Sequence, residues 1–198
     1  AASAAGVRRI VQISVIGADV DAAYPYFRAK GRVEQLVRAA PPSAAIIRPS
    51  LLFGGADELL NDLAWVLRRA PLFAVAGDGR YRVRPIHVDD LADLCVAAGA
   101  ADEDQLIDAI GPERPTFDEL VRAVRDAVGA RTWIFHAPPW LVLSAARVIG
   151  RLLGRELLTA DELASTIEGI ADIDGEATGS SSLAAWIADH GDRLGRRR

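Results

Sequence analysis

The hydrophobic and polar positions of the chain follow two periods, one typical of buried strands and the other of amphipathic helices. Residues 7–16 are nearly continuous in apolar side chains, which predicts a central parallel strand covered on both faces. Shorter apolar runs predict further strands at 44–47, 73–76, 105–110 and 132–135. Strands that alternate with helical segments indicate an α/β fold.

Helix start signals lie between these strands. Pro25 suits the first turn of a helix that runs to about Ala39 and is ended by Pro41-Pro42. Asp57, after the turn that begins at Gly54-Gly55, is the expected N-cap of a helix over 58–69 that buries leucines 59, 60, 63 and 67. Further helices are expected at 90–98 with Asp89 as N-cap, at 117–128 and 159–170 with capping boxes formed by Thr116 with Glu119 and by Thr159 with Glu162, at 140–153, and at 183–190.

Tyr26 and Lys30 are the first candidates for chemistry, because side chains four residues apart share one face of a helix. A cation beside a phenol favours the phenolate, so such a pair can exchange a proton with a substrate. Lys30 is the only lysine, and all other basic residues among the 23 Lys and Arg residues are arginines. The alternative is a surface lysine on an amphipathic helix. Tyr24 is a rival phenol, but its partner four residues on is Arg28.

Composition narrows the function class. The 198 residues are 51% hydrophobic and 25% charged, with a net charge of −4, which gives no general attraction to nucleic acid. One cysteine, Cys95, forms no internal disulfide and is expected to be a small core residue in a reducing compartment. The histidines at 87, 136 and 190 lack a paired-ligand spacing, so no metal site is expected. Because no apolar run reaches the length of a membrane span, we expect a cytoplasmic location.

The segment Tyr26-Phe27-Arg28-Ala29-Lys30 resembles the Tyr-x-x-x-Lys motif of the short-chain dehydrogenase/reductase superfamily. Upstream, the strand that ends in Ser14 lies where the family places a serine that polarises a substrate carbonyl. Downstream, Arg48-Pro49 followed by Gly54 resembles the Arg-Pro-x-x-x-x-Gly of the extended and atypical branches. The segment Ile86-His87-Val88-Asp89-Asp90 is similar to their hydrophobic-His-Val-x-Asp sequence.

This resemblance implies an NAD(P)-binding, Rossmann-type doubly wound parallel sheet with a small, mostly helical C-terminal lobe. The chain has no methionine and no glycine-rich pyrophosphate motif, so we expect it to correspond to the C-terminal two-thirds of a family member, with the first βαβ unit missing. Residues 1–110 are assigned to the dinucleotide-binding domain, with a substrate-loop insertion at about 54–85, and residues 111–198 to the lobe. The implied cofactor is NAD or NADP, and the isolated chain is expected to bind it weakly.

The resemblance also implies roles for individual residues. Tyr26 would donate or accept the hydroxyl proton, Lys30 would hold the ribose hydroxyls, and Ser14 would hydrogen-bond the developing oxyanion. All three would contact the cofactor, together with Pro49, Ser50 and Leu51. The segment from Ser50 to Leu52 would pass over the nicotinamide. Leu52 is assigned to the substrate pocket, under a roof formed by the helix over 58–69.

Three arginines alternate along the segment 80–86, which is expected to form the second strand of a hairpin after the Asp78-Gly79 turn. On one face of a strand they would form a site for an anionic substrate, with Arg82 and Arg84 as substrate-binding residues. The alternative is a solvated edge strand protected by charge. His87, which follows, is expected to have a structural role.

The helix at 140–153 carries arginines 147, 151 and 155 beside leucine and valine side chains. One interpretation places this helix on an anionic membrane or a protein partner. The other packs its apolar face on the core and leaves its arginines in water. No sequence signal decides between them.

Two functions remain open. The first is an NAD(P)-dependent oxidoreductase or epimerase/dehydratase-like protein that acts on a small-molecule substrate. The second is a non-catalytic nucleotide-binding, complex-accessory or regulatory protein, since members of the atypical branch include an accessory subunit of the respiratory NADH dehydrogenase complex and NmrA-like redox sensors. Fold alone does not decide between an enzyme and a binder.

Overall fold

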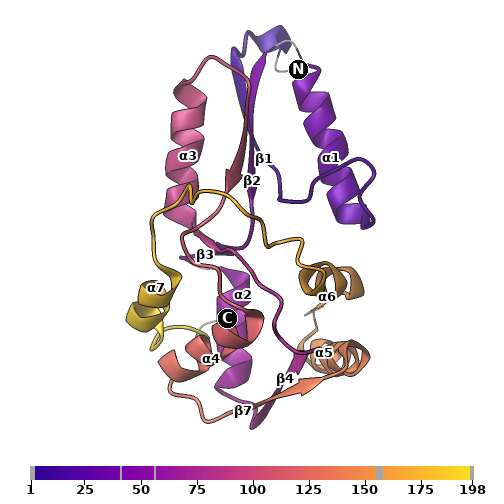
Figure 1. Ribbon diagram of the computed structural model, residues 1–198, viewed down its shortest axis with the longest axis vertical. Coiled ribbons are helices and arrows are strands. Elements are labelled where there is room, and N and C mark those ends of the chain that lie inside the picture. The colour runs from indigo at the N-terminus through magenta and orange to yellow at the C-terminus, as the bar shows by residue number, and fades with distance from the viewer. Residues whose placement is uncertain (1–2, 41, 56, 155–157, 197–198) are drawn as a thin grey trace.

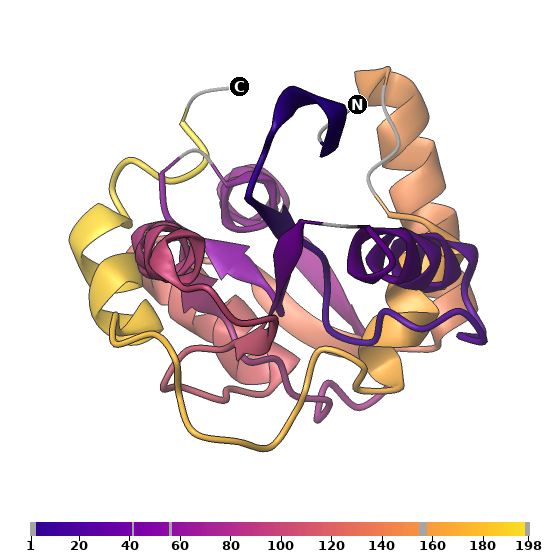
Figure 2. The same ribbon diagram turned by 90° about the horizontal axis from the view of Figure 1, so that it is seen from above.

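The computed structural model describes residues 3–40, 42–55, 57–154 and 158–196 (Figure 1). Three parallel strands form the main sheet in the order β1-β2-β6, with β1 at Arg9–Ile13, β2 at Ser43–Pro49 and β6 at Gln105–Ala109. Helix α1 (Pro25–Arg38) covers one face of this sheet and α3 (Val88–Ala100) covers the other (Figures 1 and 2). A parallel sheet with helices on both faces confirms the predicted α/β class. A short 3₁₀ helix, Ser3–Ala5, precedes β1.

The central strand of the main sheet is β2, and the prediction of a central strand at 7–16 is wrong, because β1 lies at an edge of the sheet and is only partly buried. Ala45, Ile46 and Ile47 are each at most 1% exposed, because helices lie against both faces and strands against both edges. Ala45 and Ile47 join one apolar cluster with side chains of α3 and of β6. Continuous apolar sequence is what a strand buried on both faces requires.

Helix α1 begins at the predicted proline and ends at Arg38, one residue before the expected end. Its sheet-facing side carries Gly31, where an added Cβ would lie 2.4–2.8 Å from backbone atoms of Asp19 and Val20. Glycine therefore lets the loop before the helix cross it closely. Pro41, half of the predicted Pro-Pro stop, lies outside the described residues.

A second cluster of elements lies below the main sheet in Figure 1. The two-residue strands β3 (Leu52–Phe53) and β5 (Ile86–His87) pair in parallel at its boundary. Helix α2 (Glu58–Leu67), α4 (Phe117–Ala127) and α7 (Leu183–His190) share a core with residues of β4 (Leu72–Ala76) and β7 (Trp133–Ala137). Helices α5 (Pro139–Leu153) and α6 (Ala160–Ile167) complete the described elements.

The predicted hairpin at Asp78-Gly79 is wrong. Strand β4 pairs in parallel with β7, 61 positions away in the register Leu72↔Trp133, and only the last residue of the expected second strand lies in a strand, β5. Residues 80–85 instead run beside the start of α4, where Val83 N donates to Pro115 O (3.1 Å) and Tyr81 O accepts from Phe117 N (2.9 Å). Because these backbone groups are satisfied by the loop before α4, they are not available to β4.

Helix starts agree with the predicted caps at three positions and differ at one. Asp57 accepts a hydrogen bond from Leu60 N, and both capping boxes, at Thr116 and Thr159, are formed. Helix α3, however, starts at Val88, and its N-cap is His87, whose Nδ1 accepts from Asp89 N at 3.2 Å. The predicted N-cap at Asp89 is therefore wrong, and the ring of His87 supplies the acceptor.

The apolar core forms two clusters. One joins β2, β6 and α3, and the other joins residues 53–83 to residues 120–194. The segment expected to be an insertion at about 54–85 thus packs with the C-terminal part of the chain. The domain boundary at residue 110 stays a prediction. In the described part of the chain, no helix combines the length and apolar character that crossing a membrane requires.

Candidate functional site

The first two turns of α1 present Tyr26 and Lys30 together. The Nζ of Lys30 lies 5.9 Å from the centroid of the Tyr26 ring, within the range of a cation–π contact. Tyr26 is 55% exposed, and its ring packs edge-to-face on Phe27 with centroids 5.3 Å apart. Among the described residues, neither the phenol oxygen nor the ammonium has a hydrogen-bond partner, so both are available to a ligand.

Tyr24, the rival phenol, has a different role. Its hydroxyl donates to Oε1 of Glu168 at 2.7 Å, which joins the start of α1 to the end of α6. This hydrogen bond, with burial and the charge of Glu168, raises the pKa of Tyr24 to about 12. A phenol that stays protonated and is already engaged is a poor candidate for a general base.

Ser14, the predicted oxyanion donor, lies in a buried polar cluster. Its side chain is 4% exposed, and its Oγ donates a hydrogen bond to Oε1 of Glu34. Arg48 binds the same carboxylate through two hydrogen bonds, Nε to Oε1 at 2.9 Å and NH2 to Oε2 at 2.6 Å. We call these three residues the Ser14–Glu34–Arg48 cluster.

Charge compensation keeps Glu34 ionised inside this cluster. Burial by itself would raise the pKa of Glu34, but the hydrogen bonds from Arg48 and then Ser14 outweigh it and lower that pKa. The hydroxyl hydrogen of Ser14 is therefore directed at a stable carboxylate. The structure brings Ser14 to the buried Glu34, which follows Lys30 by four residues on α1, and the described contacts of Ser14 include neither Tyr26 nor Lys30.

A small pocket lies at the carboxyl ends of β1 and β2. It has a volume of about 90 Å³. Gly17, at φ +82°, lets the pocket wall approach closely, because an added Cβ would lie 2.5 Å from Cγ2 of Ile170. The pocket is lined by Val15, Ile16, Phe27, Ser50, Ser165, Thr166, Ile170 and Ala171.

The segment after β2, which was predicted to contact the cofactor, reaches this pocket through Ser50. Pro49 ends β2 and is buried, and Ser50 donates its hydroxyl to Ala171 O at 2.7 Å. Leu51 O accepts from Ile86 N at 2.8 Å, and Leu52 begins β3. Ligand sites usually measure at least about 300 Å³, so the pocket as closed by the segment around Ala171 is too small for a nicotinamide ring with its ribose. The lining is mostly apolar, and its three hydroxyls, on Ser50, Ser165 and Thr166, donate to the backbone carbonyls of Ala171 and Glu162.

Arg82 and Arg84 do not form one arginine face, so that expectation is wrong. Arg82 is exposed and donates to Arg114 O at 2.7 Å. Arg84 is buried at 8% exposure, where its guanidinium donates to Gly111 O at 3.1 Å and to Ile173 O at 3.0 Å. The two side chains differ in burial, and residues 80–85 do not form a strand. The role of Arg82 and Arg84 in substrate binding stays a prediction. Through Ile173 O, Arg84 contacts the segment that follows Ala171.

Sequence reasoning missed Glu34 and the pocket residues of α6. Glu34 lies seven positions after Phe27 and three after Gly31, so the signal was a charged side chain on the buried stripe of an amphipathic helix. Ser165 and Thr166 carried no local signal, because α6 reaches the pocket only through the tertiary fold. Among the residues that the structure describes, no group of three His, Cys, Asp or Glu side chains is placed to hold a metal ion.

Comparisons with known proteins place the chain beside relatives of known name. No protein-family model matches the chain. It is 30% identical over 131 residues to subunit 9 of the NADH dehydrogenase [ubiquinone] 1 alpha subcomplex of Arabidopsis thaliana, which covers 65% of the chain and 32% of that protein. It is 31% identical over 151 residues to the ceramide reductase of Caulobacter vibrioides, which covers 75% of the chain and 47% of that enzyme. The chain thus spans between about a third and a half of these relatives.

Solved structures show the same fold at low sequence identity. The triphenylmethane reductase of a Citrobacter species superposes with a TM-score of 0.75 at 17% identity, over 98% of this chain and 68% of that one. A nucleoside-diphosphate-sugar epimerase of Staphylococcus aureus superposes with a TM-score of 0.71 at 15% sequence identity, over 94% of this chain and 67% of the epimerase chain. MoeE5, solved with UDP-glucuronic acid and NAD, superposes with a TM-score of 0.58 at 19% sequence identity, over 85% of this chain and 66% of the MoeE5 chain. These likenesses confirm a Rossmann-type α/β fold.

Proposed function

We propose, on the premise that the chain is homologous to extended and atypical short-chain dehydrogenase/reductases over part of their length, that the protein to which it belongs is an NAD(P)-dependent oxidoreductase or epimerase. The observation that carries this proposal is the contact between Lys30 and Tyr26 at 5.9 Å. Among the described residues, neither the Tyr26 hydroxyl nor the Lys30 ammonium has a hydrogen-bond partner. A phenol beside an ammonium is the arrangement that proton transfer to or from a substrate oxygen requires.

Each residue has a distinct role in this proposal. Bound NAD or NADP would supply or accept a hydride. Tyr26 donates a proton to the substrate oxygen, or accepts one from it, through its exposed hydroxyl. Lys30 donates hydrogen bonds to the ribose hydroxyls, and the backbone from Pro49 to Leu51 borders the nicotinamide. Ser14 assists only if its hydrogen turns from Glu34 to the substrate.

A second candidate is a nucleotide-binding or complex-accessory protein without catalysis. Two observations favour it: the hydroxyl of Ser14 is engaged by Glu34, and the pocket measures only about 90 Å³. One relative is named as a subunit of an NADH dehydrogenase and another as a reductase, so homology is compatible with either function.

Paired tyrosine variants of the complete protein separate these functions. Tyr26→Phe should reduce turnover by about 10²–10⁴-fold and leave cofactor affinity nearly unchanged, because it removes one transferable proton and no packing surface. Tyr24→Phe is the matched control and should retain turnover, since that phenol is bonded to Glu168. Normal turnover in Tyr26→Phe would refute the assigned proton donor. Cofactor binding without turnover in the wild type would support the second candidate.

Binding by the 198-residue chain tests the cofactor contacts separately. No glycine-rich pyrophosphate motif is present in this sequence, so NADH and NADPH titrations followed by tryptophan fluorescence should give no micromolar affinity. Micromolar binding would show that the contacts around Lys30 and Ser50 are sufficient. Lys30→Met in the complete protein should weaken cofactor binding, whereas Arg32→Met, at an exposed position two residues on, should not.

A further inference from the structure

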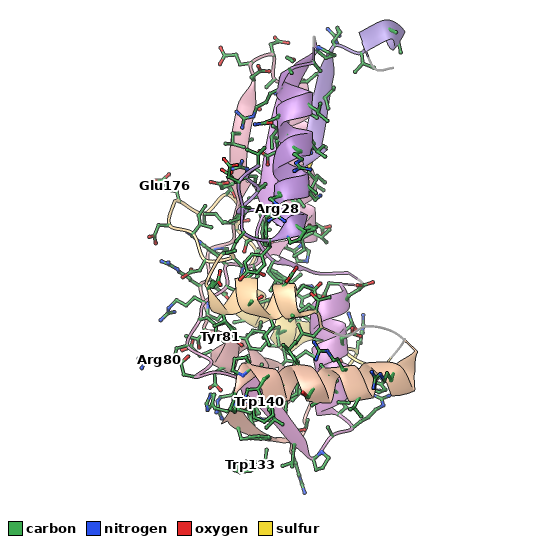
Figure 3. All side chains as sticks on the ribbon, turned by 90° about the vertical axis from the view of Figure 1, so that its right-hand side faces the viewer. Arg28, Arg80, Tyr81, Trp133, Trp140 and Glu176 are labelled. Atoms are coloured by element: carbon green, nitrogen blue, oxygen red, sulfur yellow. The ribbon has the colours of Figure 1, made fainter. Side chains whose placement is uncertain are left out.

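Helix α5 is 15 residues long, yet most of its surface is not covered by the rest of the molecule. It packs beside β4, and among its described side chains none of the large apolar ones is buried. Figure 3 shows the helix along the lower part of the molecule, with its C-terminal end projecting beyond the neighbouring elements. A largely apolar helix in this position exposes surface that water solvates poorly.

The uncovered side of α5 is organised in two adjacent stripes. Leu141, Ala145 and Val148 recur at helical spacing, with Leu141 42% and Val148 57% exposed. Beside them, Trp140 is 67% exposed and lies on the same side as the exposed residues Ser144, Arg147 and Arg151. The exposed side therefore combines an apolar stripe with a cationic one.

Strand β7 extends this surface. Trp133 is 66% exposed and stacks on Phe135, with ring centroids 5.6 Å apart. Its register partner on β4, Leu72, is 53% exposed. Trp133 and Trp140 both lie at the lower end of the molecule in Figure 3. We define the α5 face as Trp133, Trp140, Leu141, Arg147, Val148 and Arg151.

The charge of this face differs from that of the chain. The chain carries a net charge of −4, whereas every charged residue among the described positions of α5 is an arginine. The two arginines, 147 and 151, are both exposed. Arg155, which continues the series in the sequence, lies outside the described residues. A local cationic surface on an acidic protein is complementary to an anionic partner.

We propose that the α5 face binds the surface of an anionic lipid bilayer. Tryptophan favours the headgroup region, where its ring is apolar and its N–H is solvated. Arginines beside an apolar stripe place their stems along the acyl boundary and their guanidinium groups among lipid phosphates. A helix of 15 residues is about 22 Å long, shorter than the roughly 30 Å hydrocarbon core, so α5 lies in the interface plane.

Vesicle flotation of the 198-residue chain tests this proposal. The chain should float with phosphatidylcholine vesicles that contain phosphatidylglycerol and much less with phosphatidylcholine alone. Arg147→Gln combined with Arg151→Gln should weaken binding by about thirtyfold at low salt, because each arginine loses its attraction to the anionic surface. Trp140→Ser combined with Leu141→Ser should weaken it at low and high salt, because apolar contact is not screened.

Control variants on α1 remove the same groups from another exposed surface. Arg32→Gln combined with Arg38→Gln removes two exposed arginines, and Leu36→Ser removes a leucine that is 72% exposed. These variants should float like the wild type. Equal losses in the α1 and α5 variants would overturn the proposal, as would the absence of flotation with anionic vesicles. A self-association that Trp140→Ser abolishes, without vesicle binding, would assign the face to a second copy of the chain and overturn it too.

Fluorescence locates the contact independently. Brominated phospholipid should quench the wild type and should quench Trp140→Phe distinctly less, because Trp140 lies in the binding face. Trp186→Phe should be quenched at least as strongly as the wild type, since the ring that it removes is packed between His87 and His190, away from the α5 face. The reverse pattern would refute the assigned orientation. Circular dichroism of each variant confirms that a loss of binding is not a loss of fold.

Discussion

Ser14 donates its hydroxyl hydrogen to Glu34, a carboxylate that is only 3% exposed and is also held by Arg48. This contact joins the end of β1 to α1 and, through Arg48, to the end of β2. Ser14, which was predicted to act as a catalytic serine, thus helps to hold in place the helix that presents Tyr26 and Lys30. If Tyr26 and Lys30 act as proposed, the geometry of their site depends on the stability of this contact.

Replacing Arg48 by an uncharged residue should destabilise the fold strongly. Arg48→Met leaves the Glu34 carboxylate buried without a counter-charge, which should lower the free energy of unfolding by about 3 kcal/mol. Urea denaturation followed by circular dichroism measures the loss. The double variant Arg48→Met with Glu34→Leu should recover most of it, since an apolar pair does not need charge compensation. If the double variant is no more stable than Arg48→Met, the ion pair is not the cause.

The lowered pKa of Glu34 predicts a dependence of stability on pH. Because the folded-state pKa lies below the ordinary value of about 4.3, the unfolded state binds more protons in the interval between the two pKa values. The contribution of Glu34 is therefore fully present above that interval and is lost as pH falls through the folded pKa. The difference in unfolding free energy between wild type and Glu34→Gln should be constant above about pH 6 and shrink toward about pH 3. A difference that grows on acidification would contradict this sign.

Two glycine substitutions in helices should have opposite effects. Gly31→Ala should lower stability by roughly 1–3 kcal/mol, because its Cβ would lie 2.4 Å from the backbone of Asp19. Gly99→Ala in α3 should raise stability by about 0.5–1 kcal/mol, because its Cβ would make only an ordinary contact, 3.7 Å from Val11. Thermal unfolding of both variants shows whether each one is less or more stable than the wild type. Stabilisation by both would show that α1 does not approach the preceding loop as closely as described.

The phenol of Tyr24 should lose its proton only at high pH, and its pKa should depend on the carboxylate of Glu168. Its pKa is raised to about 12 chiefly by the hydrogen bond to Glu168, whereas the pKa of Tyr81 is raised to about 12 chiefly by burial. Glu168→Gln should move the Tyr24 titration toward the ordinary value near 10 and leave that of Tyr81 in place. Ultraviolet absorbance of the phenolates during alkaline titration, with Tyr24→Phe as the assignment control, measures both. An unchanged titration in Glu168→Gln would show that α6 is not bonded to Tyr24 in solution.

Local signals were sufficient for most helices and for the burial of β2, but not for the choice of the central strand, which was predicted at 7–16 and is β2. The proline of α1, the cap at Asp57 and the capping boxes at Thr116 and Thr159 act on backbone groups within four residues, so the sequence alone locates those helix starts. The apolar run of β2 likewise needs no knowledge of its neighbours, because either face of a buried parallel strand requires the same residue types.

The cap of α3 shows where local reasoning stops. Asp89 and His87 both offer an acceptor to the same helix start, and Asp89 is the more usual capping type. The ring of His87 is fixed against Phe53 and Gly54, which belong to a distant segment, and this packing sets its Nδ1 in place for Asp89 N. The contact that selects the cap is tertiary, so its signal is not in the neighbouring sequence.

The sequence by itself determined the α/β class, the periodicity of most helices and the shared helix face of Tyr26 and Lys30, because these depend on side chains within one or two helical turns. Only the tertiary structure decided that β4 pairs with β7, that Arg84 turns inward while Arg82 stays in water, and that Ser14 meets Glu34. In each case a backbone or side-chain polar group could bond to any of several partners that are distant in the sequence. That choice follows from satisfying all buried donors, acceptors and charges at once, a condition of the whole fold and not of any segment.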